Sequence, residues 1–256
     1  MSAHSAAPRR ILIVNPNTSA AITQMMVAEA RRLAPQGVEI CGATAPFGSS
    51  SLECPAELAI AAHAVLTVLA EERGYDAAII GAFGDPGLSA AADLLDVPVF
   101  GLGRAGLEAA SCQGQRRFAL ITVGPHLRAS LQQAAQDAQV DPVLTGLTFL
   151  PARVLELARD PAAFRDGMLA AARACVTTQG AEAVLFAGAP FAGIGRLLSA
   201  DLPVPVFDGL TSAVERALTV PARARTGADA PQPLEKDMVG LSAELKRLIT
   251  RRLSAS

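Results

Sequence analysis

Tryptophan is absent from this chain of 256 residues, and aromatic residues make up only 4% of it. Neither charge sign dominates, because 22 Lys and Arg residues stand against 24 Asp and Glu residues. Proteins that bind nucleic acid use basic side chains for the phosphates or aromatic side chains on which bases stack. Basic residues are in no excess here and aromatic residues are scarce, so we expect no nucleic-acid partner.

Cysteine is also scarce. The four cysteines, Cys41, Cys54, Cys112 and Cys175, stand far apart, and none belongs to a Cys-x-x-Cys pair. This spacing indicates neither a zinc site nor a disulfide framework. Reduced thiols are typical of the cytosol, so we predict a cytoplasmic protein with no metal site.

Long hydrophobic runs are missing too. The apolar stretch that follows Arg9 and Arg10 is far shorter than the roughly 20 residues that span a membrane. We expect residues 1–9 to form a flexible tail and the chain to have no membrane partner. Hydrophobic residues nevertheless make up 51% of the sequence, which is enough to bury one large core or two modest ones.

Short strand-like runs alternate with Ala-rich stretches of helical length. In residues 10–107 the expected strands are 11–14, 38–43, 77–82 and 97–102, with helices over 20–33, 55–72 and 88–95. In residues 108–212 the expected strands are 118–123, 145–150, 181–187 and 204–210, with helices over 126–138, 161–177 and 193–199, and a last helix over 211–218. This alternation predicts βαβ units and parallel sheets.

The second series of elements resembles the first at the level of residues. VPVFG (97–101) matches VPVFD (204–208), and Gly74 and Ala77 have counterparts farther on at a nearly constant spacing. Such agreement in order and spacing predicts an internal duplication. We therefore expect two similar α/β lobes, formed by residues 10–107 and 108–212.

The remainder of the chain, residues 213–256, is expected to return to the first lobe. Residues 221–235 are rich in Pro, Ala and charged residues, which is typical of a linker. A helix is predicted over 237–252, with Leu241 and Leu245 near one face. This helix either packs back on a lobe or binds a partner.

Ligands of open parallel sheets bind outside the carboxyl ends of the strands, in the loops that precede the helices. Two facing lobes would place both sets of loops around one cleft. The polar loops of this kind are 15–19, 44–54, 82–88, 122–127 and 187–193. No phosphate-binding motif stands among them, and GLGRAG (101–106) follows the fourth strand of its lobe rather than the first. We therefore predict no nucleotide site.

The loop NPNTS (15–19) places Asn15, Asn17, Thr18 and Ser19 where a strand gives way to a helix. Amide and hydroxyl groups beside free backbone N–H groups favour a carboxylate or ureide oxygen. The same residue types are also common turn formers and N-caps. Ligand binding and a purely local role both stay open for this loop.

Three further side chains are candidates for chemistry. Cys54 precedes a helix that would begin at Pro55, and a thiol at a helix N-terminus can become nucleophilic; a buried, inert thiol is the alternative. Asp85 lies in AFGDPGL (82–88), where it acts either as a base or as a turn residue. For His126, acid–base chemistry, helix capping and simple surface exposure all stay open.

These segments together resemble the hydantoin and allantoin racemase branch of the aspartate/glutamate/hydantoin racemase superfamily. The matching pieces are NPNTS (15–19), FGSSSLE (47–53), FGDPGL (83–88), DVPVFG (96–101), EAVLFAGAPFAG (182–193) and VPVFDG (204–209). The resemblance implies two flavodoxin-like lobes with parallel sheets, related by a pseudo-two-fold, with an active cleft between them. It also implies cofactor-independent proton transfer at a carbon next to a carbonyl, carried out by two cysteines, one from each lobe.

Both of these cysteines are missing. The family's first thiol position, directly before FGDPGL, is Ala82, and the second, after the matching strand of the later repeat, is Gly188. Neither side chain can move a proton, so the two-thiol reaction is lost. We expect a divergent enzyme, with Asp85, Glu53 and His126 as candidates for a replacement base and Cys54 as a single thiol.

The expected substrate is a small carboxylate, a hydantoin-like ring or an amide, and the expected reaction is hydrolysis, elimination or non-thiol isomerisation. The residues expected to bind it are Asn15, Thr18, Ser51, Ala82, Phe83, Thr122, Gly188 and Ala189. Two alternatives remain: a racemase or isomerase mutated at its cysteines, and a non-catalytic small-molecule binding protein. We also expect a homo-oligomer, because relatives often form one.

Overall fold

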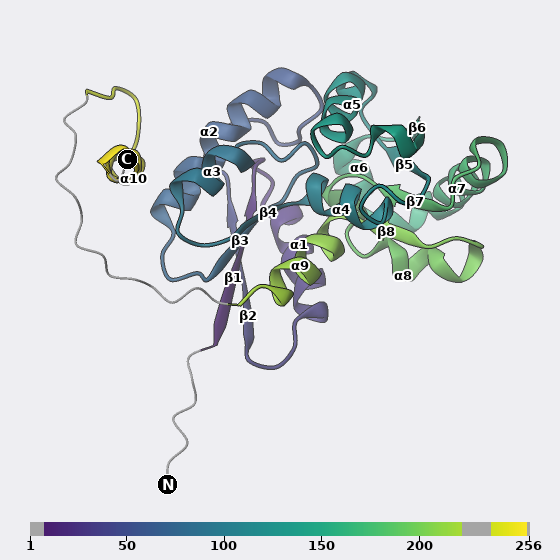
Figure 1. Ribbon diagram of the computed structural model, residues 1–256, viewed down its shortest axis with the longest axis horizontal. Coiled ribbons are helices and arrows are strands. Elements are labelled where there is room, and N and C mark those ends of the chain that lie inside the picture. Colours follow the sequence, from purple (N-terminus) through teal and green to yellow (C-terminus); the bar gives the residue numbers. More distant parts are fainter. Residues whose placement is uncertain (1–7, 222–236, 255–256) are drawn as a thin grey trace, which may run out of the picture.

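The computed structural model describes residues 8–221 and 237–254, so the expected tail (1–9) and linker (221–235) lie almost entirely outside the described residues. Within these residues eight strands form two separate parallel sheets of four strands each. Figure 1 shows the first sheet with its helices in purple and blue and the second in teal and green.

The first sheet has the strand order β2-β1-β3-β4. Its strands are β1 (Arg9–Asn15), β2 (Val38–Thr44), β3 (Ala77–Ile80) and β4 (Val99–Gly101), and the helices that follow them are α1 (Ala20–Leu33), α2 (Pro55–Glu71), α3 (Leu88–Leu94) and α4 (Leu102–Ala110). The central strands are buried over residues 11–15 of β1 and over all of β3, and apart from Asn15 these residues are apolar, as expected for a parallel sheet covered by helices. We call this half the first lobe.

The second sheet has the equivalent order β6-β5-β7-β8. Its strands are β5 (Phe118–Thr122), β6 (Leu144–Phe149), β7 (Ala183–Phe186) and β8 (Val206–Asp208), and its helices are α5 (Arg128–Asp137), α6 (Val154–Arg159), α7 (Arg165–Gln179), α8 (Ile194–Leu198) and α9 (Gly209–Thr219). We call this half the second lobe. The shared strand order confirms the predicted α/β fold with two parallel sheets, whereas the duplication and the pseudo-two-fold stay predictions.

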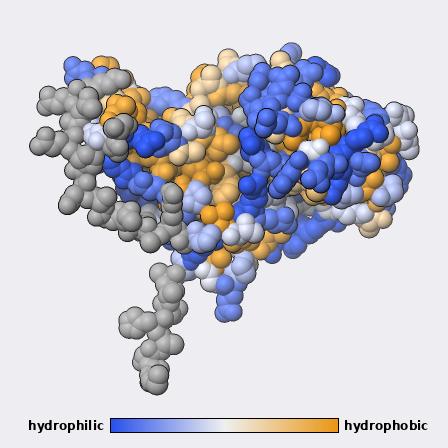
Figure 2. All heavy atoms as spheres, in the orientation of Figure 1, coloured by the Kyte–Doolittle hydropathy of each residue, from blue (hydrophilic) through white to orange (hydrophobic). Residues whose placement is uncertain are grey.

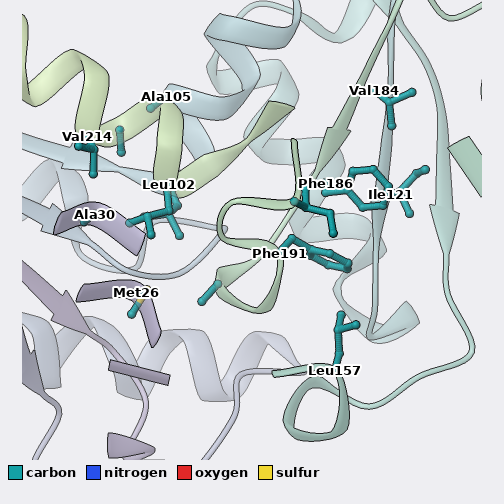
Figure 3. Packing of buried hydrophobic residues seen from close by; sticks show 14 of the residues in the cluster. Met26, Ala30, Leu102, Ala105, Ile121, Leu157, Val184, Phe186, Phe191 and Val214 are labelled. Atoms are coloured by element: carbon teal, nitrogen blue, oxygen red, sulfur yellow. The ribbon is translucent and has the colours of Figure 1, made fainter. Parts of the chain in front are cut away.

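The helices α4 and α9 join the two lobes. α4 contacts β7 and β8, and α9 contacts β3 and β4, so each helix packs against the sheet of the other lobe. Gly209 allows this approach, because a Cβ there would lie 2.6 Å from the carbonyl oxygen of Leu102. The resulting core runs across the molecule, from Met26 on α1 through Leu102 to the rings of Phe186 and Phe191, which contact each other at a tilt of 46° (Figure 3).

The last helix, α10 (Ala243–Ser254), packs on α2 and α3 of the first lobe. Its Leu245 is buried, and Arg251 and Arg252 form ion pairs with Asp96 and Asp93. The surface in Figure 2 mixes polar and apolar residues on the face shown. No helix in the described part of the chain is both long and apolar enough to cross a membrane.

Candidate functional site

A pocket of about 530 Å³, counting the space at its open mouth, lies at the carboxyl ends of β3 and β7. Its lining residues come from both lobes: Asn17, Ile22, Leu52, Gly81, Ala82 and Phe83 from the first, and Thr122, Val123, Leu127, Leu131, Val154, Ala187, Gly188, Ala189 and Pro190 from the second. Ala82 and Gly188 therefore face one shared space. This is the location that the strand-end rule predicts for a ligand.

The asparagine that lines the pocket is Asn17, whereas Asn15 lies behind it. Asn15 is completely buried, and its Nδ2 donates to Asn17 Oδ1, to the Ser19 carbonyl and to Thr23 Oγ1. Asn17 Oδ1 also accepts from the Ser19 N–H, but Asn17 Nδ2 has no acceptor within residues 8–221 and 237–254. Asn17 thus offers the pocket a hydrogen-bond donor, and a direct substrate contact by Asn15 is not supported by the geometry.

Thr122 lines the pocket from the end of β5. Its hydroxyl donates to the Ala187 carbonyl, with 2.7 Å between the oxygen atoms. Because that proton is engaged, Thr122 Oγ1 can act toward a ligand only as an acceptor, through its lone pairs. The pocket therefore carries one side-chain donor from the first lobe and one side-chain acceptor from the second.

Backbone N–H groups add to this set. Within the part of the chain that the structure describes, the N–H groups of Ala82, Phe83, Gly188 and Ala189 donate to no protein acceptor. Gly188 has φ 124° and ψ 154°, a region of backbone conformation that is essentially limited to glycine. The turn after β7 therefore depends on the absence of a side chain at 188, whereas Ala82 has no positive φ.

Residues 11–217 match the family model described as Asp/Glu/Hydantoin racemase. The chain belongs to this family. It is 30% identical over 213 residues to a hydantoin racemase of Pseudomonas sp. (strain NS671), a match that covers 82% of this chain and 85% of that protein. A hydantoin racemase of Paenarthrobacter aurescens is also 30% identical, over 80% of this chain and 87% of its own length.

Solved structures agree with this family assignment. The fold is similar to the allantoin racemase from Klebsiella pneumoniae, with a TM-score of 0.78 and 30% identity over 82% of this chain and 86% of that one. It is also similar to the allantoin racemase from Pseudomonas fluorescens, with a TM-score of 0.79 and 29% identity over 90% and 100%. The relatives are enzymes, and the family assignment makes this racemase-family chain an enzyme as well.

Asp85 does not line the pocket of this racemase-family chain. Its carboxylate accepts hydrogen bonds from the backbone N–H groups of Gly103 and Arg104, in the first turn of α4, at 2.8 and 2.6 Å. Burial raises the pKa of Asp85 to about 6, although these two hydrogen bonds and the charge of Arg104 act to lower it. The Asp85 side chain therefore caps α4 and does not reach the pocket, which supports neither a base in the pocket nor a side chain bonded within its own turn.

The loop of residues 44–54 closes one side of the pocket through Leu52, but its other candidates point elsewhere. Ser51 Oγ donates to Glu53 Oε1 at 2.7 Å, so these two side chains bind each other. Cys54 is the N-cap of α2 and lies outside the lining. Thr18 and His126 are exposed, and neither lines the pocket.

Glu57 is the residue of this region that the sequence reasoning missed. Its carboxylate accepts from the backbone N–H groups of Glu53 and Cys54 at 2.6 and 3.0 Å. Burial acts to raise the pKa of Glu57, but the hydrogen bonds from Glu53, Ser49 and Cys54 outweigh it and hold the pKa below its usual value. The sequence signal for this residue was a Glu three residues after the N-cap position, as in a capping box. The hydrogen bonds of Glu57 hold the loop in place.

The lining of the pocket contains no titratable side chain. Among the described residues no cluster of His, Cys, Asp and Glu has the arrangement of a metal site. The pocket can therefore bind and polarise a ligand through Asn17, Thr122 and backbone N–H groups, but none of its own side chains can take a proton from carbon. The assignment of the two thiol positions to Ala82 and Gly188 rests on the sequence motifs and stays a prediction.

Proposed function

We propose that this chain is a cofactor-independent isomerase that binds a small neutral hydantoin-like ring and promotes proton exchange at the carbon next to a ring carbonyl, without protein thiols. The observation that carries the proposal is the pairing of Asn17 Nδ2, a donor, with Thr122 Oγ1, an acceptor, in one pocket. A carbonyl beside an N–H group, as in a cyclic ureide or amide, presents the complementary pair.

A neutral ring suits the pocket better than a carboxylate does. No Lys, Arg or His side chain lines it, so a bound carboxylate would lose its hydration without gaining a counter-charge. Among the reactions that the sequence left open, hydrolysis and elimination both need a positioned nucleophile or base. Isomerisation at an acidified carbon needs less from the protein, because stabilising the enolate oxygen is enough to accelerate it.

In the proposed step, hydroxide from solvent removes the proton from the ring carbon and becomes water. The electron pair of the broken C–H bond moves onto the carbonyl, and the enolate oxygen receives hydrogen bonds from Asn17 Nδ2 and the backbone N–H groups that follow β3 and β7. Water then returns a proton to either face of the ring and regenerates hydroxide. The protein contributes electrostatic stabilisation, and solvent carries the proton.

The test is deuterium incorporation from heavy water into one enantiomer of 5-methylhydantoin, together with loss of optical rotation. We expect both to proceed faster than in buffer alone and to accelerate as pH rises. Asn17→Ala and Thr122→Val should each slow the exchange about tenfold, the worth of one lost hydrogen bond of roughly 1.4 kcal/mol. Exchange no faster than in buffer at any pH overturns the proposal.

Thr145→Val is the matched control. Like Thr122, Thr145 donates its hydroxyl to a backbone carbonyl, in this case that of Phe118, but it does not line the pocket. Both variants lose a hydroxyl of the same kind from the second sheet. Only Thr122→Val should affect exchange if the hydroxyl acts on the ligand.

Binding without turnover is the outcome that opposes the proposal, because the pocket lining carries no titratable side chain. In that case 5-methylhydantoin raises the melting temperature but is recovered unchanged in composition and chirality after long incubation. We also propose a cytoplasmic homo-oligomer. Light scattering coupled to size-exclusion chromatography measures the oligomeric state.

A further inference from the structure

Asn15 forms the centre of a hydrogen-bond network directly behind the pocket. The side chain has no exposed surface, and its Nδ2 lies 2.9 Å from Asn17 Oδ1, 2.9 Å from the Ser19 carbonyl oxygen and 3.0 Å from Thr23 Oγ1. Its Oδ1 accepts from the Asn17 backbone N–H. Both N–H groups of the Asn15 amide are therefore directed at protein acceptors, and the buried side chain does not reach the pocket lining.

This network determines which way the Asn17 amide faces. Asn17 Oδ1 accepts from two donors, Asn15 Nδ2 and the Ser19 N–H, each at 2.9 Å. The flipped amide would place Asn17 Nδ2 against both donors, leave the Ser19 N–H without an acceptor and turn the Asn17 N–H groups toward other N–H groups. Because such buried unpaired groups are unfavourable, the unflipped orientation is selected, and Nδ2 is the group that remains for the pocket.

The network is anchored on two elements of the first lobe. Thr23, in the second turn of α1, accepts from Asn15 and is 2.7 Å from the hydroxyl of Thr44 at the end of β2. Ser19, the N-cap of α1, supplies both an acceptor for Asn15 and a donor for Asn17. Asn15 therefore holds Asn17 against a rigid part of the fold rather than within a free loop.

We infer that Asn15 is a positioning residue, which acts on the ligand only through Asn17 by keeping the Asn17 amide nitrogen turned into the pocket. The importance of that nitrogen for a ring carbonyl rests on the proposed function, whereas the orientation itself rests on the hydrogen bonds above. Asn15→Asp is the sharpest perturbation, because it keeps the shape of the side chain but replaces the donor that faces Asn17 Oδ1 with an acceptor.

A double-mutant cycle with Asn15→Asp and Asn17→Ala tests the inference, with affinity for 5-methylhydantoin as the readout. We expect Asn15→Asp to weaken binding about tenfold in the wild-type background, as for one lost hydrogen bond. In the Asn17→Ala background the same change should weaken binding less than about twofold, since its target is gone. Independent, additive losses from the two changes would contradict a positioning role and indicate a general structural one.

Two further variants separate positioning from loss of structure. Thr23→Val removes one acceptor of Asn15 Nδ2 and keeps the other two, so it should reproduce a weaker form of the Asn15→Asp effect if that variant fails to fold. Thr44→Val is the control, because the Thr44 hydroxyl lies within hydrogen-bond distance of Thr23 but forms no hydrogen bond with the Asn15 side chain, although the two residues are neighbours in the sheet. Affinity should be unchanged in Thr44→Val, and a loss there equal to that of Thr23→Val would overturn the inference.

A measurement without ligand keeps the inference testable if the proposed function fails. In wild-type protein the side-chain amide of Asn17 should be as ordered on the picosecond to nanosecond timescale as the backbone of α1, measured by ¹⁵N relaxation. In Thr23→Val and Asn15→Asp its order parameter should fall while that of the α1 backbone is kept. An unchanged Asn17 order parameter contradicts the inference, whereas a wild-type protein that binds no 5-methylhydantoin contradicts only the proposed function.

Discussion

The carboxylate of Asp85 occupies at the N-terminus of α4 the place that Asp208 occupies at the N-terminus of α9. Asp208 is the N-cap of α9, accepts from the Thr211 N–H and also accepts from the Gly193 N–H in the preceding loop. In the first lobe the N-cap position is Gly101. There the aspartate lies in the loop instead of at the N-cap, and Asp85 accepts hydrogen bonds from the backbone N–H groups of the helix.

The position of the Asp85 carboxyl group leaves no room for a side chain at residue 101. A Cβ at Gly101 would lie 2.2 Å from Cγ of Asp85, so the two lobes place a carboxyl group at the same point from opposite sides. Gly101 itself has φ −112° and ψ 146°, a conformation that any residue adopts. The constraint on this position is therefore steric rather than conformational.

The first prediction concerns variants that move the capping aspartate of the first lobe from residue 85 to residue 101, the N-cap position that Asp208 holds in the second lobe. Asp85→Gly should destabilise the protein by about 1–2 kcal/mol through loss of the cap. Gly101→Asp should destabilise it further, because its carboxyl group meets that of Asp85. The double variant should recover most of the lost stability, since the aspartate introduced by Gly101→Asp can cap α4 and the glycine introduced by Asp85→Gly suits the φ of 47° found there. Urea denaturation measures all three.

Additive losses in the double variant would mean that the loop and the helix need Asp85 for another reason. Asp85→Asn provides a comparison, because it keeps the shape but replaces one acceptor with a donor. It should be less stable than the double variant at pH 7.

The pH dependence of stability provides the second prediction. The pKa of Asp85 is about 6 in the folded protein and near its ordinary 3.8 in the unfolded chain. Between these values the folded state holds a proton that the unfolded state has lost, so the contribution of Asp85 to stability falls as pH rises from about 4 to 6 and is constant above. The stability of Asp85→Asn relative to wild type should rise over the same interval, as measured by urea denaturation at pH 4.5 and 7. A constant difference would contradict the buried, protonatable state of Asp85.

Most of the fold was predictable from the sequence because each strand is a short apolar run bounded by turn residues. The exceptions are the short helix α6 and the helix α4, neither of which the sequence analysis predicted; α4 is the more informative of the two. Its segment LGRAGLEAA contains two glycines, which are poor helix formers. Tertiary packing against α9 and the second sheet, together with the cap from Asp85, stabilises a helix that local propensity does not indicate.

The sequence predicted which loops form the pocket, but it did not predict which of their side chains face it. NPNTS does reach the pocket, yet through Asn17 rather than Asn15, because the last strand residue points into the fold and the turn then presents the second asparagine. Asp85 looked like a candidate base because its loop borders the pocket. Its direction depends on α4, which comes from a different part of the chain, so local sequence could not show it.

The ion pair between Glu29 on α1 and Arg196 on α8 joins the two lobes and carries the third prediction. Arg196 Nη2 lies 2.6 Å from Glu29 Oε2, and the Glu29 side chain is only 8% exposed. Arg196→Ala should destabilise the protein by about 1–2 kcal/mol, less than for a fully buried pair because Arg196 is half exposed. Arg165→Ala, which breaks the exposed pair with Asp201, is the matched control and should change stability by less than about 1 kcal/mol. Equal effects would mean that the position of Glu29 between the lobes is unimportant.

Insensitivity to thiol reagents is the fourth prediction. Cys41, Cys54, Cys112 and Cys175 all lie outside the pocket lining. Treatment with iodoacetamide should therefore leave ligand affinity and hydantoin exchange within about twofold of the untreated protein, less than the worth of one hydrogen bond. Cys54→Ser is the necessary comparison, because Cys54 is two residues from Leu52 in the lining. A loss that appears in wild type but not in Cys54→Ser would restore Cys54 as a functional thiol.

The last prediction concerns the introduction of cysteine at residues 82 and 188. The structure predicts a different stability cost for each of these two substitutions. At Ala82 the side chain already has a Cβ and no positive φ, so Ala82→Cys should be tolerated within about 0.5 kcal/mol. At Gly188 there is room, since the nearest atom to an added Cβ is 3.6 Å away. Its positive φ of 124°, however, is a backbone conformation that residues with a side chain rarely adopt. Gly188→Cys should therefore destabilise the protein by about 1–3 kcal/mol through backbone strain.

Two-thiol racemization needs both groups, so the double variant is the informative one. We expect it to racemize 5-methylhydantoin faster than wild type. Iodoacetamide should remove this gain in the double variant, whereas it should leave the activity of wild type unchanged. Gly188→Ala distinguishes strain from chemistry, because it carries the same backbone cost without a thiol. If Gly188→Ala is as stable as wild type, the turn after β7 adapts freely. If the double variant is stable but inactive, the family's thiol positions lie elsewhere than Ala82 and Gly188.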